Sequence, residues 1–259
     1  ISSVRSLSMI EIILLSILQG ITEFLPISSS SHLILVSKYL NFSNQSLNID
    51  MSLHAGSLIA VITYFKKDII YFLKDQSLLY KIIISSFPVM IVGYYLVKLG
   101  VIDQLRSFKV IGWTTIIFGI FLYLLDKSKI EININDDFSY KSALLVGCFQ
   151  ILSLVPGVSR SGITISAARI LKFDRADSAK ISFLLSIPTL LAVTIFNFYS
   201  LYNSNNLNFS LLNILAVFLS YIVSFITIKY FLIYLKKFSL NIFVIYRIIL
   251  GSIILFYLS

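Results

Sequence analysis

The feature that most constrains this chain is a series of long apolar segments separated by short charged turns. A helix needs about 20 predominantly apolar residues to cross a bilayer. A short segment, Met51–Phe65, could still span because the two lysines that follow it can extend to the interface. We therefore expect an all-α polytopic membrane protein with about six transmembrane helices. The other five segments are Lys81–Val97, Phe108–Leu125, Ala179–Tyr199, Leu211–Tyr234 and Ile242–Leu258.

The composition favours the same class. Of the 259 residues, 58% are hydrophobic and only 13% are charged, whereas a soluble domain carries about 25% charged residues. No stretch is long and polar enough to be a linker, so we predict one membrane domain over residues 1–259. The net charge of +9 does not indicate nucleic-acid binding, because the basic residues lie in short turns and form no stripe interleaved with exposed aromatics.

Two further apolar segments differ from the spans because polar residues interrupt them. Met9–Tyr39 is broken by Glu23, Pro26 and a run of serines, and Lys141–Leu171 is broken by a Pro-Gly pair and Arg160. Irregular backbone at membrane depth is tolerated only where it is buried in protein or lines a wet cavity. We therefore predict two re-entrant helical hairpins.

The two hairpins resemble each other and indicate an internal repeat. One reads LQGITEFLPISSSSH and the other FQILSLVPGVSRSG, and similar runs follow them, SLIAVITYF and TLLAVTIF. Three predicted spans separate the hairpins, and an odd number inverts the second copy. We expect an inverted-topology repeat with copies at about residues 9–97 and 141–235. Such repeats, when their helices are discontinuous, place the site near the membrane midplane.

The distribution of positive charge predicts the orientation. One set of turns holds 13 basic residues: Lys66–Lys81, Lys127–Lys141, Arg169–Lys180 and Lys236–Lys237. The opposite side holds five: Arg5, Lys38, Lys98, Arg106 and Lys109. Since cytoplasmic loops carry the excess of Lys and Arg, both termini are predicted outside. The first hairpin then enters from outside and the second from the cytoplasm.

The first hairpin contains an acid at membrane depth. Gln19 and Glu23 lie four residues apart and share a helix face. A buried acid costs several kcal/mol unless it is paired, hydrated or bound to a metal, which makes it a functional candidate. The alternative is a hydrogen-bonded pair that only packs helices.

The turn that follows carries four serines and a histidine. Hydroxyls and free N–H groups at a helix start suit a phosphate, and Ser, His and Glu together can form an activated nucleophile. His32 lies one helical turn beyond Ser29, so it is placed to contact that hydroxyl. The alternative, strongest for Ser30 and Ser31, is that the serines cap the helix.

The second hairpin carries an arginine in the middle of an apolar segment. Arg160 is flanked by Ser159 and Ser161 and followed by Thr164. A guanidinium there needs an anion, and its planar fork matches phosphate oxygens. The alternative is a structural ion pair between Arg160 and Glu23.

The histidines and cysteines argue against a zinc site, because the chain has two His and one Cys. A Mg²⁺ or Ca²⁺ ion held by Glu23 and pyrophosphate oxygens is the expected cofactor, since hard cations bind through one or two carboxylates plus substrate phosphates. His54 either faces the site or packs in the helix bundle.

Both polar motifs resemble those of a known family, the undecaprenyl-diphosphate phosphatases, also called bacitracin-resistance proteins. The resemblance rests on Gln19-x-x-x-Glu23 with the turn Pro26–His32, and on Pro156–Thr164. It implies hydrolysis of undecaprenyl diphosphate to the monophosphate and phosphate in a bacterial inner membrane, which recycles the carrier lipid of peptidoglycan synthesis. It also implies catalytic roles for Glu23, Ser29, His32 and Arg160.

The substrate-binding candidates beside them are Gln19, Ser28, Ser30, Ser159, Ser161 and Thr164. The chain departs from the family at three places. Gln19 stands where many members have Glu, so the role of base passes to Glu23. Ser30-Ser31 replaces a common Thr-Gly pair, and His54 replaces a common Gln.

Two other functions fit the same architecture. A lipid-phosphate transporter would also use an inverted repeat and an arginine that binds a headgroup, and a non-catalytic membrane scaffold is the third option. The expected partners are a polyprenyl diphosphate lipid and the bilayer, with a homodimer as an option. The nucleophile stays open between Ser29, His32 and water.

Overall fold

The computed structural model describes residues 8–39, 47–74, 76–128, 138–204 and 210–258, and every regular element within them is helical. The elements are α1 (Met9–Thr22), α2 (Ser29–Tyr39), α3 (Leu47–Tyr64), α4 (Lys66–Lys74), α5 (Gln76–Lys98), α6 (Val101–Gln104), α7 (Phe108–Asp126), α9 (Tyr140–Ile151), the 3₁₀ helix η1 (Leu152–Leu154), α10 (Arg160–Ile170), α11 (Arg175–Asn203), α12 (Leu211–Leu235) and α13 (Asn241–Tyr257).

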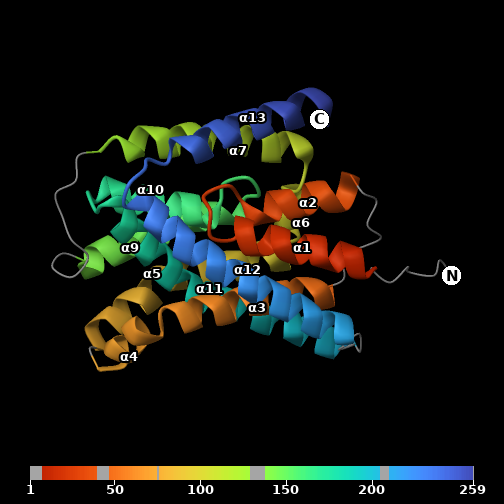
Figure 1. Cartoon of the computed structure of the whole chain (residues 1–259), viewed down its shortest axis with the longest axis horizontal. Coiled ribbons are helices and arrows are strands. Elements are labelled where there is room, and N and C mark those ends of the chain that lie inside the picture. Colours follow the sequence, from red (N-terminus) through yellow and green to blue (C-terminus); the bar gives the residue numbers. More distant parts are fainter. Residues whose placement is uncertain (1–7, 40–46, 75, 129–137, 205–209, 259) are drawn as a thin grey trace.

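Most of the long helices run along the long axis of the molecule (Figure 1). Four of them, α5, α7, α11 and α12, are long and apolar enough to cross a membrane. Shorter apolar helices are α1, α9 with η1, and α13. Large hydrophobic side chains such as Phe87, Trp113 and Tyr199 are exposed on the surface, as expected for a surface that faces lipid. The prediction of an all-α, multi-pass membrane protein is confirmed.

The helix limits differ from the predicted spans at several places. The segment predicted at Met51–Phe65 lies in α3, which has 18 residues, and the one at Ile242–Leu258 lies in α13, which has 17. Neither is among the four spans. The charged turn predicted at Lys66–Lys81 contains the short helix α4 and the first turn of α5. Polar ends continue these helices because the hydrogen bonds of the backbone do not stop where the apolar run does.

The two interrupted segments form helix–turn–helix hairpins that enter the bundle from opposite ends (Figure 1). The first is α1 and α2, and the second is α9 with η1 and α10. A proline in each turn, Pro26 and Pro156, lacks an N–H group and restricts the residue before it, so neither helix continues through. In both hairpins a serine with positive φ immediately precedes the second helix: Ser28 at 75° and Ser159 at 72°.

The hairpins pack across the molecule. Helix α1 lies on α12, α9 lies on α5, and α3 packs on both α11 and α12. Small residues permit these contacts. A Cβ added at Gly147 of α9 would lie 2.5 Å from the Ser85 carbonyl oxygen of α5. Between α3 and α12, the Ser57 hydroxyl lies 3.2 Å from that of Ser220 and 3.0 Å from that of Ser224.

One end of the bundle is held by a buried ionic cluster. Asp126, at the end of α7, accepts from Arg175 at 2.6 Å and from the Leu240 N–H at 3.1 Å. Arg169 of α10 donates to the carbonyl groups of Asp126 and Ser128. This cluster brings together three of the four turns that the charge count placed on one side. Parts of the predicted topology, namely Arg5, Lys129 and most of the 41–50 turn, lie outside the described residues.

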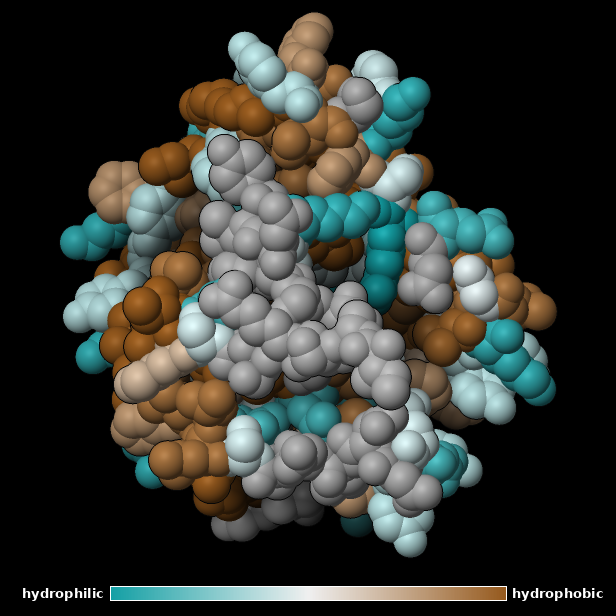
Figure 2. Space-filling model, turned by 90° about the vertical axis from the view of Figure 1, so that its right-hand side faces the viewer, coloured by the Kyte–Doolittle hydropathy of each residue, from teal (hydrophilic) through white to brown (hydrophobic). Residues whose placement is uncertain are grey.

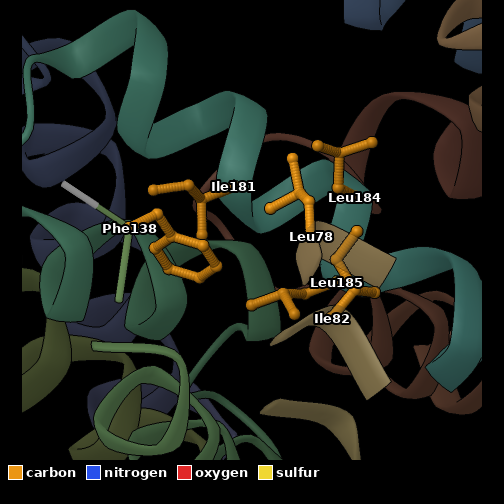
Figure 3. A pocket seen from close by; sticks show the side chains of 6 residues that line it. All are labelled: Leu78, Ile82, Phe138, Ile181, Leu184 and Leu185. Atoms are coloured by element: carbon orange, nitrogen blue, oxygen red, sulfur yellow. The ribbon is translucent and has the colours of Figure 1, made fainter. Parts of the chain in front are cut away.

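An end view and a close-up show one face of the molecule and a small pocket. Figure 2 looks at the end where α1 begins and α13 finishes, and hydrophilic side chains (teal) lie there beside hydrophobic ones (brown) that cover much of the periphery. A small pocket between α5 and α11 (Figure 3) has no polar lining and so offers no group for chemistry. Its side chains are Leu78, Ile82, Phe138, Ile181, Leu184 and Leu185.

Candidate active site

Glu23 is the centre of a group of hydrogen bonds where the two hairpin turns meet. Its Oε2 accepts from the Ser29 hydroxyl at 2.7 Å and from the Gln19 amide at 3.2 Å. Its Oε1 accepts from the Arg160 guanidinium at 3.0 Å, in an ion pair. Glu23 is only 7% exposed. The fold therefore brings a carboxylate and a hydroxyl of the first hairpin against the guanidinium of the second.

The four consecutive serines occupy different environments. The Ser28 hydroxyl lies 3.3 Å from that of Ser30 and 3.0 Å from that of Ser31. Ser28 and Ser31 are buried, Ser29 is half-buried and Ser30 is exposed. The turn thus separates one hydroxyl, which donates to Glu23, from a group of three in which Ser28 contacts both Ser30 and Ser31.

His32 does not make the contact with Ser29 that its spacing suggested. Its Nδ1 lies 2.7 Å from the carbonyl oxygen of Ser28, and its Nε2 lies 2.6 Å from the hydroxyl of Tyr246 on α13. The rings of His32 and Tyr246 are nearly parallel, with an interplanar angle of 9°. Both nitrogens of the imidazole are therefore occupied, although His32 lies one turn from Ser29.

Arg160 makes the ion pair that was the alternative to phosphate binding, but the pair does not use the whole guanidinium. Nη2 donates to Glu23, and Nη1 donates to the carbonyl of Ser182 on α11 at 3.1 Å. Within the described part of the chain, Nε has no hydrogen-bond partner, and the side chain is 14% exposed. The guanidinium is thus anchored yet can still donate to a ligand.

The other polar residues of the second hairpin bond to protein. Ser159 caps the first turn of α10. Ser161 donates to the carbonyl of Leu25 in the first hairpin at 2.8 Å. Thr164 donates to the hydroxyl of Ser182 at 2.7 Å and is fully buried. These hydrogen bonds join the two hairpins and α11, while the predicted substrate-binding roles of the three residues stay predictions.

Two helix N-termini meet at this point. α2 begins at Ser29 and α10 begins at Arg160, directly after the two serines with positive φ. The first N–H groups of a helix have no partner within it, and the helix dipole places partial positive charge there. Two such termini beside Arg160 form a setting that favours a phosphate or diphosphate.

The fit of a divalent cation depends on Glu23. The described residues contain no group of three or more His, Cys, Asp or Glu side chains that could hold a metal. Both oxygens of Glu23 already accept hydrogen bonds. A cation here fits only if a diphosphate supplies most of its ligands. The Nδ1 of His54 lies 2.7 Å from the Asp50 carbonyl of its own helix, and a role for His54 in the site stays a prediction.

Sequence reasoning missed two residues of α13. Tyr246 reaches His32, and the next residue, Arg247, is fully buried beneath both turns. The guanidinium of Arg247 donates at 2.8 to 3.2 Å to four main-chain carbonyls, those of Pro26, Thr115, Gly157 and Val158. An arginine inside an apolar segment was a usable signal for Arg247. Tyr246 gave no signal, because a tyrosine in an apolar helix is ordinary.

The chain is similar to known proteins over nearly its whole length. The family described as Bacitracin resistance protein BacA matches residues 12–253. An undecaprenyl-diphosphatase of Pelagibacter ubique (strain HTCC1062) is 50% identical, over 96% of this chain and 97% of that protein. Two further proteins of that name are similar: one from Campylobacter curvus (strain 525.92), 40% identical over 96% of this chain and 99% of its own, and one from Jannaschia sp. (strain CCS1), 38% identical over 96% and 98%. With a family match over most of its length and relatives that are similar from end to end, the chain belongs to the bacitracin resistance protein BacA family.

Proposed function

We propose that this chain hydrolyses undecaprenyl diphosphate to undecaprenyl phosphate and inorganic phosphate. That reaction recycles the lipid carrier of peptidoglycan synthesis and gives resistance to bacitracin. The observation that carries the proposal is the contact of the Ser29 hydroxyl with Glu23, 2.7 Å apart, beside Arg160 of the opposite hairpin. The names of the relatives favour a phosphatase over a transporter.

The headgroup is bound in this proposal by Arg160 and the two helix N-termini. One charge contact at 4 Å is worth roughly 4 kcal/mol at an effective dielectric of about 20, before desolvation. The exposed Ser30 and the buried Ser28 lie on the same turn as additional headgroup donors. Gln19 orients Glu23 through the hydrogen bond from its amide. The diphosphate competes with Glu23 for the guanidinium, which leaves the Glu23 carboxylate to act on Ser29.

The chemical step begins at Ser29. Its hydroxyl already donates to Glu23, so Glu23 accepts the proton as the new bond between Ser29 Oγ and the terminal phosphorus forms. The bond from that phosphorus to the bridging oxygen breaks, and undecaprenyl phosphate leaves. Water then releases phosphate from Ser29. His32 is the candidate that relays the proton of that water.

A Mg²⁺ or Ca²⁺ ion belongs to the proposal. Glu23 is the carboxylate that would hold it, together with phosphate oxygens of the substrate. The ion would neutralise charge on the diphosphate. Removal of divalent ions by EDTA, followed by return of Mg²⁺ or Ca²⁺, tests this part.

The finer architecture is also proposed: six transmembrane helices in a bacterial inner membrane, two re-entrant hairpins, and an inverted repeat with both termini outside. The reciprocal packing of α1 on α12 and of α9 on α5 supports the repeat, as do the matching serines before α2 and α10. Cysteine labelling tests the orientation. In a Cys148→Ser background, a cysteine at Ser204 should react with an impermeant thiol reagent in intact cells, and one at Lys236 should not.

A phosphate-release assay tests the function. Protein purified in detergent is given undecaprenyl or farnesyl diphosphate with Mg²⁺ or Ca²⁺, with Glu23→Gln as the inactive control. Released phosphate that depends on Glu23 supports the proposal. Lipid binding without release contradicts it and favours the transporter, and the absence of both favours the scaffold. Light scattering of the same sample tests whether the chain forms a homodimer.

A further inference from the structure

His32 is held between two partners that together define its protonation pattern. The carbonyl oxygen of Ser28 can only accept a hydrogen bond, so Nδ1, 2.7 Å away, must carry a proton. In a neutral imidazole Nε2 is then the acceptor, and the Tyr246 hydroxyl, 2.6 Å away, must be the donor. The neutral form is favoured because His32 is buried, at 7% exposed, and burial disfavours an added charge.

We infer that Tyr246 is a positioning residue for the phosphatase reaction, and that it acts by donating to Nε2 of His32, which orients the ring in the neutral Nδ1–H tautomer that the Ser28 carbonyl selects. This inference rests on the proposed function, since it assigns Tyr246 to the proton-transferring residue of that site. Nε2 is then the nitrogen of His32 that exchanges protons. The hydroxyl of Tyr246 fixes the edge of the ring on which that nitrogen lies.

The neighbouring Arg247 explains how α13 can hold a histidine in place. Its guanidinium is fully buried and bonds to carbonyls of both hairpin turns and of α7. α13 also packs along α7. Arg247 fixes the position of α13 along its axis relative to the two hairpin turns. The side chain of the preceding residue, Tyr246, therefore contacts His32 at a defined place. Tyr246 is 41% exposed, so it packs loosely and its contact with His32 is its main polar contact in the described structure.

The kinetic test compares two tyrosines of one helix. Tyr246→Phe keeps the ring and removes the hydroxyl, and Tyr257→Phe makes the same change at an 83% exposed position near the end of α13. We expect kcat of Tyr246→Phe for farnesyl diphosphate to fall about tenfold, as when a histidine loses a hydrogen-bond partner that orients its ring, with KM unchanged within about twofold. Tyr257→Phe should match the wild type.

A spectroscopic test reads the tautomer without activity. The chain has two histidines, so a His54→Gln variant with a histidine-free purification tag and ¹⁵N-labelled histidine reports on His32 alone. We expect a protonated Nδ1 and an unprotonated, hydrogen-bonded Nε2. Adding Tyr246→Phe should move the Nε2 signal, because its hydrogen bond is lost, and should leave Nδ1 protonated, because the Ser28 carbonyl still accepts from it. Unchanged spectra, or a protonated Nε2 with a bare Nδ1, would overturn the inference.

The experiments distinguish failure of the proposed phosphatase function from failure of the role given to Tyr246. A wild type that releases no phosphate contradicts the proposed function, but the nitrogen spectra still test the contact with Tyr246. A wild type that is active, together with Tyr246→Phe at full kcat and unchanged nitrogen signals, contradicts the role of Tyr246 and leaves the phosphatase assignment intact. Loss of both kcat and thermal stability in Tyr246→Phe would mean that the hydroxyl only holds the fold.

Discussion

Two arginine–carboxylate contacts of this molecule look similar but leave different groups free. At the end of the bundle, both oxygens of Asp126 accept hydrogen bonds, from Arg175 and the Leu240 N–H. Nη1 and Nη2 of Arg169 donate to neighbouring carbonyls, whereas its buried Nε has no hydrogen-bond partner in the described structure. At the hairpin turns, Glu23 instead accepts a hydrogen bond from a hydroxyl.

The difference lies in what a ligand could still contact. The cluster around Asp126 joins α7, α10, α11 and the turn before α13, and the one donor that it leaves without a hydrogen bond in the described structure, Arg169 Nε, belongs to a side chain that is 1% exposed. A ligand cannot reach that donor, which is the behaviour of a structural ion pair. The cluster around Glu23 retains a half-buried hydroxyl, the Nε of Arg160 and two helix N-termini. Burial of an ion pair therefore does not identify a site. Unsatisfied donors that a ligand can reach are the better sign: Arg160 is 14% exposed, whereas Arg169 is 1% exposed.

The largest effect that would sharpen this comparison is expected at Ser29 and Glu23. Ser29→Ala should abolish turnover and leave lipid binding nearly intact, because chemistry is lost while the headgroup contacts remain. Glu23→Gln keeps the shape but removes the base, so it should be as damaging. Phosphate release and binding of a farnesyl diphosphate analogue measure the two properties.

The outcome at Ser29 decides the nucleophile. If Ser29→Ala keeps most of its turnover while Glu23→Gln does not, the attacking group is water or another side chain, and His32 becomes the next candidate. A trapped phosphoserine in the wild type would settle the step in favour of Ser29.

The next effect in size is expected at Arg160. Arg160→Lys retains the charge but loses the planar fork that reaches both Ser182 and Glu23, so kcat/KM should fall by at least about two orders of magnitude. The same assay measures it. A near-native rate would show that a positive charge at position 160 is enough for catalysis. Arg160 would then not differ from the arginines around Asp126 in the way proposed here.

The opposite result is expected at the structural cluster. Asp126→Asn leaves Arg169 and Arg175 without their buried counter-charge, which costs roughly 3 kcal/mol, so the midpoint of thermal unfolding should fall by several degrees. The matched control is Asp68→Asn, whose partner Lys180 is 29% exposed, and which should cost less than about 1 kcal/mol.

The activity of Asp126→Asn completes that test. At low temperature the folded variant should retain kcat within about twofold, since the cluster makes no contact with the proposed nucleophile. A loss of kcat as large as that of Arg160→Lys, in protein that is still folded, would erase the distinction between the two regions.

Much of the fold could be predicted because apolar length and interruptions by Pro, Ser and Arg reflect local physics. Those signals indicated the two hairpins and the closeness of Glu23 to Arg160. They did not indicate which hydroxyls bond to other parts of the protein. Thr164 was predicted to bind substrate, yet its hydroxyl bonds to Ser182, 18 residues away.

The contacts of α13 could not be predicted for a different reason. His32 and Tyr246 are 214 residues apart, and their contact exists only because Arg247 docks α13 on both turns. A periodic apolar pattern shows that a helix has a buried face, but not which neighbour it meets. The spacing of Ser29 and His32 suggested a local contact. In the structure, the Nε2 of His32 is hydrogen-bonded to the distant Tyr246 instead.

The smallest effect should appear within the serine turn. It tests whether Ser29 alone reacts while the other serines support the turn. Ser28 has two hydroxyl partners, the exposed Ser30 and the buried Ser31. Loss of either one leaves the other, so Ser30→Ala or Ser31→Ala should cost about 1 kcal/mol, the scale of a lost cap, or about fivefold in rate. Removal of both should exceed the sum of the single losses, because Ser28 then keeps neither partner. Parallel rate measurements on the two single variants and the double variant decide this. A loss of about a hundredfold in Ser30→Ala alone would place that hydroxyl at the phosphorus beside Ser29, and the separation of one reactive serine from three supporting ones would be wrong.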